Sequence, residues 1–176
     1  MWLALRPPSQ GGGDSLMSAQ IAAVGTTPTI PELFVGSLMQ GTVSDARSVL
    51  RFVEDTDVDE PAATVLMAVR AVALRGTPPS PQLIHDELKR RGRFTRSTGV
   101  WLTSAVTSGA CSSAAPAYAG ALVSESLRSN VESFGHAMTS MSATASEADI
   151  VAVVERAAAG IRGIAARLTE LRGESL

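Results

Sequence analysis

The chain is 176 residues long, with 45% hydrophobic, 18% charged and 4% aromatic residues. This length is enough for one hydrophobic core of ordinary size, and the few aromatics predict that the core is aliphatic. A formal net charge of -2 and a pI near 5.7 exclude a general attraction to nucleic acid. The single cysteine, Cys111, excludes an internal disulfide and a multi-cysteine metal site, so we expect a protein of the reducing cytoplasm.

Residues 1–28 are expected to form a disordered tail. The opening MWLALRPP has too short an apolar run for a secretory signal, and the following PPSQGGGDS is typical of turns and linkers. Met17 is an alternative start. No later stretch approaches the roughly 18 uninterrupted apolar residues that a membrane span needs, so no membrane association is expected.

Residues 29–110 are predicted to form a small helical head. Pro31 is suited to the first position of a helix, and Ser44 and Pro61 mark the starts of a second and a third. Ser80 with the proline after it begins a fourth helix, and Gly92 supplies the left-handed residue that ends it. No strand-like alternation competes with these signals, so the fold class is all-α.

Residues 114–172 are predicted to form a long antiparallel helical hairpin. Two apolar series, spaced three and four residues apart as in a coiled-coil seam, run Leu127, Val131, Phe134, Met138, Met141 and Ile150, Val154, Ala157, Ile161, Ile164, Leu168, Leu171. Between them, Ser146 and Asp149 have the spacing of a capping box at a helix start. A short turn there joins two helices that lie side by side.

Two helices alone cannot bury every apolar residue of this hairpin. Leu122, Val123, Val151 and Val153 lie off the predicted seam, and either the head or a second copy of the chain must cover them. A homodimer is the simplest assembly, with a trimer of dimers left open. The predicted dimer or partner interface comprises Leu122, Val123, Leu127, Val131, Phe134, Met138, Val151, Val154, Ile161, Ile164 and Leu168.

The sequence contains no recognisable catalytic, cofactor or metal site. Lys89 is its only lysine and follows leucine rather than glycine, which excludes a phosphate-binding loop of the GxxxxGK[ST] type. His85 and His136 have no second ligand at metal-binding spacing, and Cys111 has no identifiable base. The acidic segment 54–60 lacks the glycine and closing glutamate of a calcium loop and is predicted to be a solvated turn. We therefore expect a protein that is not an enzyme.

One basic cluster is a candidate for ligand contact: Lys89, Arg90, Arg91, Arg93 and Arg96. It is either the solvated face of a helix or a patch that binds phosphates or an acidic partner. The first alternative is favoured by the core-facing spacing of Leu83, Ile84 and Leu88 and by the absence of interleaved aromatics that would support stacking on single strands.

Four segments, in order, resemble the N-terminal domain of the bacterial replicative DNA helicase of the DnaB type. They are ELFVGSLMQG, LIHDELKRRGRF, STGVWL and AAPAYAGALVSESLR, and together they place the resemblance over residues 31–171. The residues that carry it are Glu32, Gly36, Ser37, Leu38, Leu88, Arg91, Gly92, Gly99, Trp101, Leu102, Ala117, Tyr118, Ala119, Val123, Glu125 and Arg128. The chain departs from the family at EDTDVDEPAAT, where an aromatic-rich segment and a histidine are usual.

The resemblance implies a helical head and hairpin without catalytic residues, which dimerises through hairpins and docks the C-terminal domain of primase. The family continues into an ATPase domain where this sequence ends in ELRGESL. We expect either an excised domain or, given the divergent sequence and its own N-terminal tail, a stand-alone homologue. The expected function is a replication accessory that binds primase or the replicative helicase, and the alternative is a nucleic-acid-binding protein that uses residues 89–96.

Overall fold

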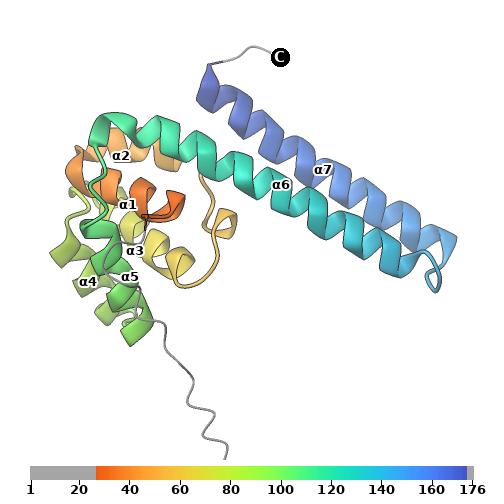
Figure 1. The fold of residues 1–176 in the computed structure, drawn as a ribbon, viewed down its shortest axis with the longest axis horizontal. Helices are drawn as coiled ribbons and strands as arrows, with labels where there is room; N and C mark the ends of the chain where they lie inside the picture. Colours follow the sequence, from red (N-terminus) through yellow and green to blue (C-terminus); the bar gives the residue numbers. More distant parts are fainter. Residues whose placement is uncertain (1–26, 174–176) are drawn as a thin grey trace, which may run out of the picture.

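The computed structural model describes residues 27–173, and within them every regular element is helical. The predicted tail therefore lies almost entirely outside the described residues. The elements are α1 (Ile30–Gln40), α2 (Val43–Leu50), the 3-10 turn η1 (Asp55–Asp57), α3 (Ala62–Leu74), α4 (Pro81–Arg90), α5 (Arg96–Val106), the 3-10 turn η2 (Ser112–Ala114), α6 (Ala115–Met141) and α7 (Glu147–Arg172). Figure 1 shows α1 to α5 gathered into a head, from which α6 and α7 extend as an antiparallel hairpin. The all-α prediction is confirmed.

Local signals explain most of the helix ends. Ser146 accepts a hydrogen bond from the backbone N–H of Asp149 and begins α7, as its spacing predicted. Gly92 has φ +63°, the left-handed conformation expected after α4. The predicted start of α2 was wrong by two residues, because Thr42 rather than Ser44 is the N-cap and accepts from the N–H of Asp45.

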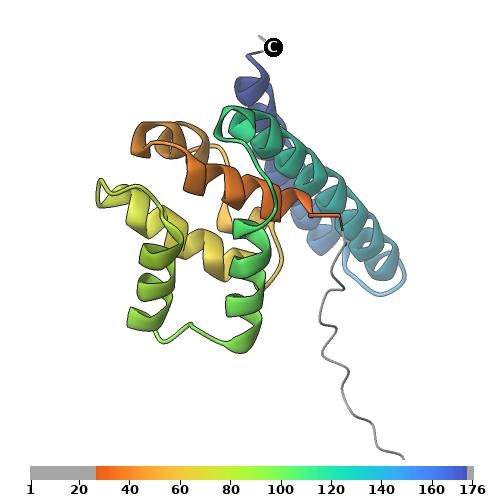
Figure 2. The same cartoon turned by 60° about the vertical axis from the view of Figure 1, so that its left-hand side comes forward.

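The head packs around α1. Phe34, Val35 and Leu38 are fully buried in one aliphatic core with residues of α3, α5 and α6. Gly36 permits the closest approach, since a Cβ there would lie 2.6 Å from the carbonyl oxygen of Ala105 in α5. Figure 2 shows α1 between the other head helices and the start of α6. Gly36, one of the residues that carry the family resemblance, therefore lies where α1 and α5 touch.

The base of the hairpin shares the core of the head. Ala119, Leu122 and Val123 of α6 and Ile164 and Leu168 of α7 belong to the same buried cluster as α1 and α3. In Figure 1 and Figure 2 the other half of the hairpin, toward the turn between α6 and α7, extends beyond the head. The head and the hairpin are thus distinct in shape but continuous in packing.

Candidate interaction surfaces

The seam between α6 and α7 departs from the predicted heptad series at three positions, whereas the other residues of the two series are buried or half-buried. Asn130 is half-buried and Val131 exposed on α6, while Val153 is half-buried and Val154 exposed on α7. The prediction that Val131, Met138 and Val154 lie in the seam was wrong, since all three are exposed. On α7 the adjacent Val153 and Val154 are both apolar, and on α6 the polar Asn130 takes the seam position, so apolar spacing alone could not identify the seam residue on either helix.

Four large apolar side chains remain exposed on the hairpin. Their exposed fractions are 50% for Val131, 43% for Met138, 56% for Val151 and 39% for Val154. Val131 and Met138 are seven residues apart, and Val151 and Val154 are three apart, so each pair shares one side of its helix. We call this set the apolar flank.

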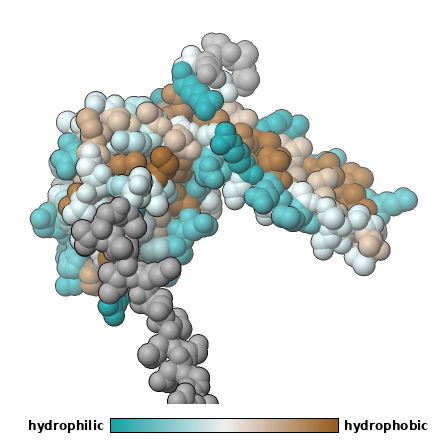
Figure 3. All heavy atoms as spheres, in the orientation of Figure 1, coloured by the Kyte–Doolittle hydropathy of each residue, from teal (hydrophilic) through white to brown (hydrophobic). Residues whose placement is uncertain are grey.

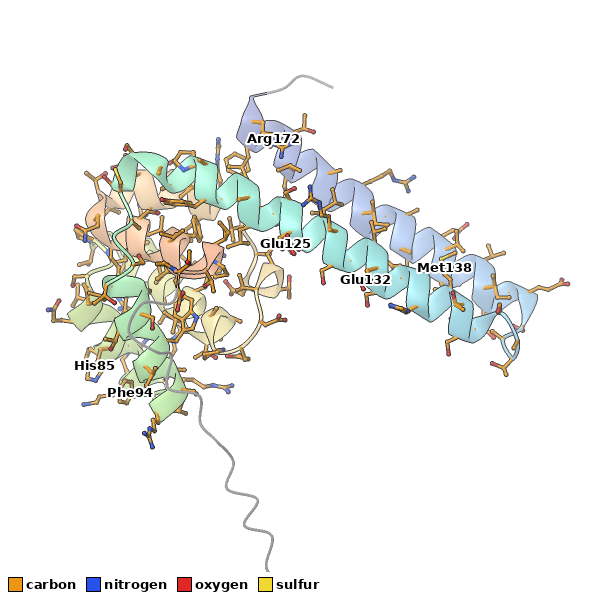
Figure 4. The ribbon with its side chains drawn as sticks, in the orientation of Figure 1. His85, Phe94, Glu125, Glu132, Met138 and Arg172 are labelled. Carbon is orange, nitrogen blue, oxygen red and sulfur yellow. The ribbon has the colours of Figure 1, made fainter. Side chains whose placement is uncertain are left out.

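The apolar flank faces away from the head. On α6 the seam residue Asn130 is followed by Val131 and preceded by Ser129, which borders the head. On α7, Arg167 precedes the seam residue Leu168 and binds Asp57 of the head. Val154, by contrast, follows the seam residue Val153. In an antiparallel pair the positions that follow the seam turn to the same side of both helices. Figure 3 shows hydrophobic residues along this side of the hairpin. Figure 4 places Met138 there, with Glu125 and Glu132 along the edge of α6 that is turned away from α7.

The remaining residues of the predicted interface are covered to different degrees within this chain. The head buries Leu122 and Val123, which answers the choice between the head and a second copy for these two residues. Ile164 and Leu168 are also buried. Leu127, Phe134 and Ile161 are half-buried. The exposed part of the predicted interface is therefore the apolar flank.

A buried ion pair joins the head to the hairpin. Arg167 of α7 donates from Nη1 to Asp57 Oδ2 at 2.6 Å and from Nη2 to Asp57 Oδ1 at 3.0 Å, and it also donates to the carbonyl oxygen of Phe52 at 2.8 Å. Ser126 of α6 donates its hydroxyl to Asp57 at 2.7 Å. The Asp57 side chain is 2% exposed. The pair borders a cleft of about 520 Å³ between the head and the hairpin.

This pair corrects the prediction of a solvated acidic turn at 54–60. Asp57 is buried against the hairpin, and Asp55 pairs with Arg70 of α3 at 3.0 Å. The partners are 110 and 15 residues away in sequence, so no local signal could have revealed them. The acidic segment instead contributes to the attachment of the hairpin.

The basic cluster is organised around one buried carboxylate. Glu87, with its side chain 1% exposed, accepts hydrogen bonds from Arg90 at 2.7 Å, from Arg75 of α3 at 2.8 Å, and from Arg91. Hydrogen bonding from Arg90 is the largest cause that lowers the pKa of Glu87, to about 2, against an opposing effect of burial. Sequence reasoning missed both Arg75 and Glu87, which become neighbours only when α3 packs against α4.

The other residues of the cluster lie at the corner between α4 and α5. Ile84 and Leu88 are buried as predicted, but Leu83 is 38% exposed. The interpretation that no aromatic is interleaved with these cations was wrong, because Phe94 lies between Arg93 and Arg96. Phe94 is 39% exposed and lies edge-on to His85, with ring centroids 4.5 Å apart. Figure 4 shows both rings together at this end of the head. We call Arg75, Lys89, Arg90, Arg91, Arg93, Phe94 and Arg96 the basic corner.

The candidate nucleophile and metal ligands lie apart from one another. Cys111 is exposed, and a hydrogen bond from Ser113 lowers the pKa of its thiol. His85 packs on Phe94, and His136 is exposed on α6 beside Glu132. Within residues 27–173, no group of three metal-binding side chains comes together. The described helices include none long and apolar enough to cross a membrane.

These features define an all-helical protein with a compact head and a projecting hairpin. No protein-family model matches the sequence, and no curated protein does. A crystal structure of the N-terminal domain of DnaB helicase from Mycobacterium tuberculosis is similar, with 25% identity and a TM-score of 0.61. The match covers 78% of this chain and 99% of that one. The chain has the fold of the DnaB N-terminal domain, as its sequence resemblance implied.

Proposed function

We propose that the chain is a non-enzymatic interaction and oligomerisation module of DNA replication. It forms a homodimer through the apolar flank of the hairpin, with a trimer of dimers as the larger assembly. It docks the C-terminal domain of primase or the replicative helicase. The fold shared with a helicase N-terminal domain supports this role, and the exposed apolar flank is the observation that carries it.

The exposure of the flank gives a driving force for association. Full burial of one such side chain contributes about 1.5 to 3 kcal/mol, and the four members are about half exposed. A partner that covers them gains roughly 3 to 6 kcal/mol per chain, before the cost of association. The half-buried Leu127, Phe134 and Ile161 border the flank and extend the surface that a second copy would cover.

Light scattering after size exclusion tests the dimer. The wild-type chain at roughly tens of micromolar should have twice the monomer mass. Val131→Glu with Val154→Glu should raise the dimer Kd by more than about 100-fold, because each carboxylate would be buried without a partner. Ser133→Glu with Ala152→Glu is a matched control, since both positions are exposed on the same two helices away from the flank. A monomeric wild-type chain, or equal effects of both pairs, would refute the dimer.

The partner is tested by the same measurement in mixtures. The chain is combined with the primase C-terminal domain of the same organism, and separately with its replicative helicase. A complex with either protein supports the docking role. Loss of the complex in the flank variant, but not in the control pair, shows that docking requires the flank. A dimer that binds neither protein would retain the oligomerisation module but refute the replication role.

A further inference from the structure

The positive charge of the chain is concentrated at one end of the head. Residues 75–96 contain six cations and two carboxylates, a local charge of +4, so the rest of the chain carries -6 of the total of -2. One of the two carboxylates, Glu87, is buried beneath three arginines. An approaching polyanion therefore meets guanidinium and ammonium groups at this end, although the protein as a whole is acidic.

Glu87 holds three of the five arginines of the basic corner in fixed positions. Arg75 comes from the end of α3, while Arg90 and Arg91 come from the end of α4, and all three meet on the same carboxylate. Arg91 donates to this carboxylate through Nε. Among the described residues nothing accepts a hydrogen bond from its two terminal nitrogens, so these can donate to a bound phosphate. Because the side chains are already ordered, a phosphate that binds them costs less conformational entropy.

An exposed aromatic ring lies among these cations. Phe94 is 39% exposed, and the Lys89 ammonium is 5.8 Å from the centre of its ring. Beneath it, Gly99 of α5 has no side chain, and the Phe94 ring would lie 3.2 Å from a Cβ placed there. The glycine thus seats the ring against α5 while part of the ring stays accessible. Cations beside an accessible aromatic ring are the combination that binds unpaired bases and their backbone.

We propose that the basic corner binds single-stranded nucleic acid, with its cations on consecutive phosphates and Phe94 stacked on a base. The fixed guanidinium groups favour phosphate, which accepts paired hydrogen bonds from arginine. The accessible ring favours a single strand over a duplex, whose bases are already stacked, and over an acidic peptide, which offers no flat ring. This site lies on the head, so it is independent of the hairpin and of the proposed dimer.

Fluorescence anisotropy of a labelled oligothymidylate of about 20 nucleotides tests the proposal across a salt series. The full chain should bind at low salt. Lys89→Ala, Arg93→Ala and Arg96→Ala together should reduce the slope of log affinity against log salt by about 2, at about 0.7 for each lost phosphate contact. These three side chains avoid the Glu87 network. Phe94→Leu, which retains an apolar contact over Gly99, should weaken binding about fivefold or more.

Arg156→Ala, Arg162→Ala and Arg172→Ala together form the matched control, because they remove the same charge from exposed positions of α7. Binding that survives in this control and is lost in the corner variants supports the site. Equal losses in both triple variants, or no binding by the wild-type chain at low salt, would overturn it. The proposal would also fail if polyglutamate bound more tightly than the oligonucleotide and Phe94→Leu had no effect.

Discussion

The ion pair between Arg167 and Asp57 should determine how firmly the hairpin is attached to the head. Arg167→Ala removes the bidentate partner of a carboxylate that is 2% exposed and leaves it two donors, the hydroxyl of Ser126 and the backbone N–H of Glu54. Breaking a fully buried pair typically costs about 3 to 5 kcal/mol. The adjacent cleft gives water access to the carboxylate after the change, so we expect a loss of about 2 to 3 kcal/mol.

Urea unfolding followed by far-UV circular dichroism measures this loss. The expected decrease corresponds to a fall in Tm of roughly 5 to 10 °C for a protein of this size. Arg167→Lys should lie between the two, because lysine keeps the charge but cannot form the paired hydrogen bonds. Arg156→Ala, an exposed arginine of the same helix, should cost less than about 0.5 kcal/mol. If Arg167→Ala is no more destabilising than this control, the junction does not hold the hairpin.

Three other changes test the packing of the head and the seam. Because the folded-state pKa of Glu87 is lowered from 4.5 to about 2, its contribution to stability is present above about pH 4.5 and is lost as the pH falls toward 2; Glu87→Gln should lack this loss in acid unfolding. Gly36→Ala should lower the free energy of unfolding by about 1 to 3 kcal/mol, since its methyl group would press on the Ala105 carbonyl; an unchanged urea midpoint would contradict the close approach. In dilute protein, Val153→Ala should cost about 1 kcal/mol and Val154→Ala less than half of that; the reverse order would restore the predicted seam.

The basic cluster marks the limit of sequence reasoning about the candidate sites. Its members from α4 onward lie within residues 89–96 and were found by counting charges. Their organisation was not, because Glu87 faces the core side of α4 and Arg75 reaches it from another helix. Phe94 shows the same limit: its place beside Arg93 is visible in the sequence, but whether its ring is buried or accessible depends on the packing of α4 against α5.

The sequence by itself determined the helical class, the long hairpin and several helix ends, because these follow from apolar spacing and from residues that cap or end a helix locally. The resemblance over residues 31–171 also rested on short local motifs, and the shared fold agrees with it. Tertiary structure alone decided that Asn130 and Val153 rather than Val131 and Val154 face the seam, that the head covers Leu122 and Val123, and that the Asp57 side chain is buried. Those outcomes depend on surfaces brought together from distant parts of the chain, and a side chain's neighbours across such a surface leave no periodic trace in its own segment.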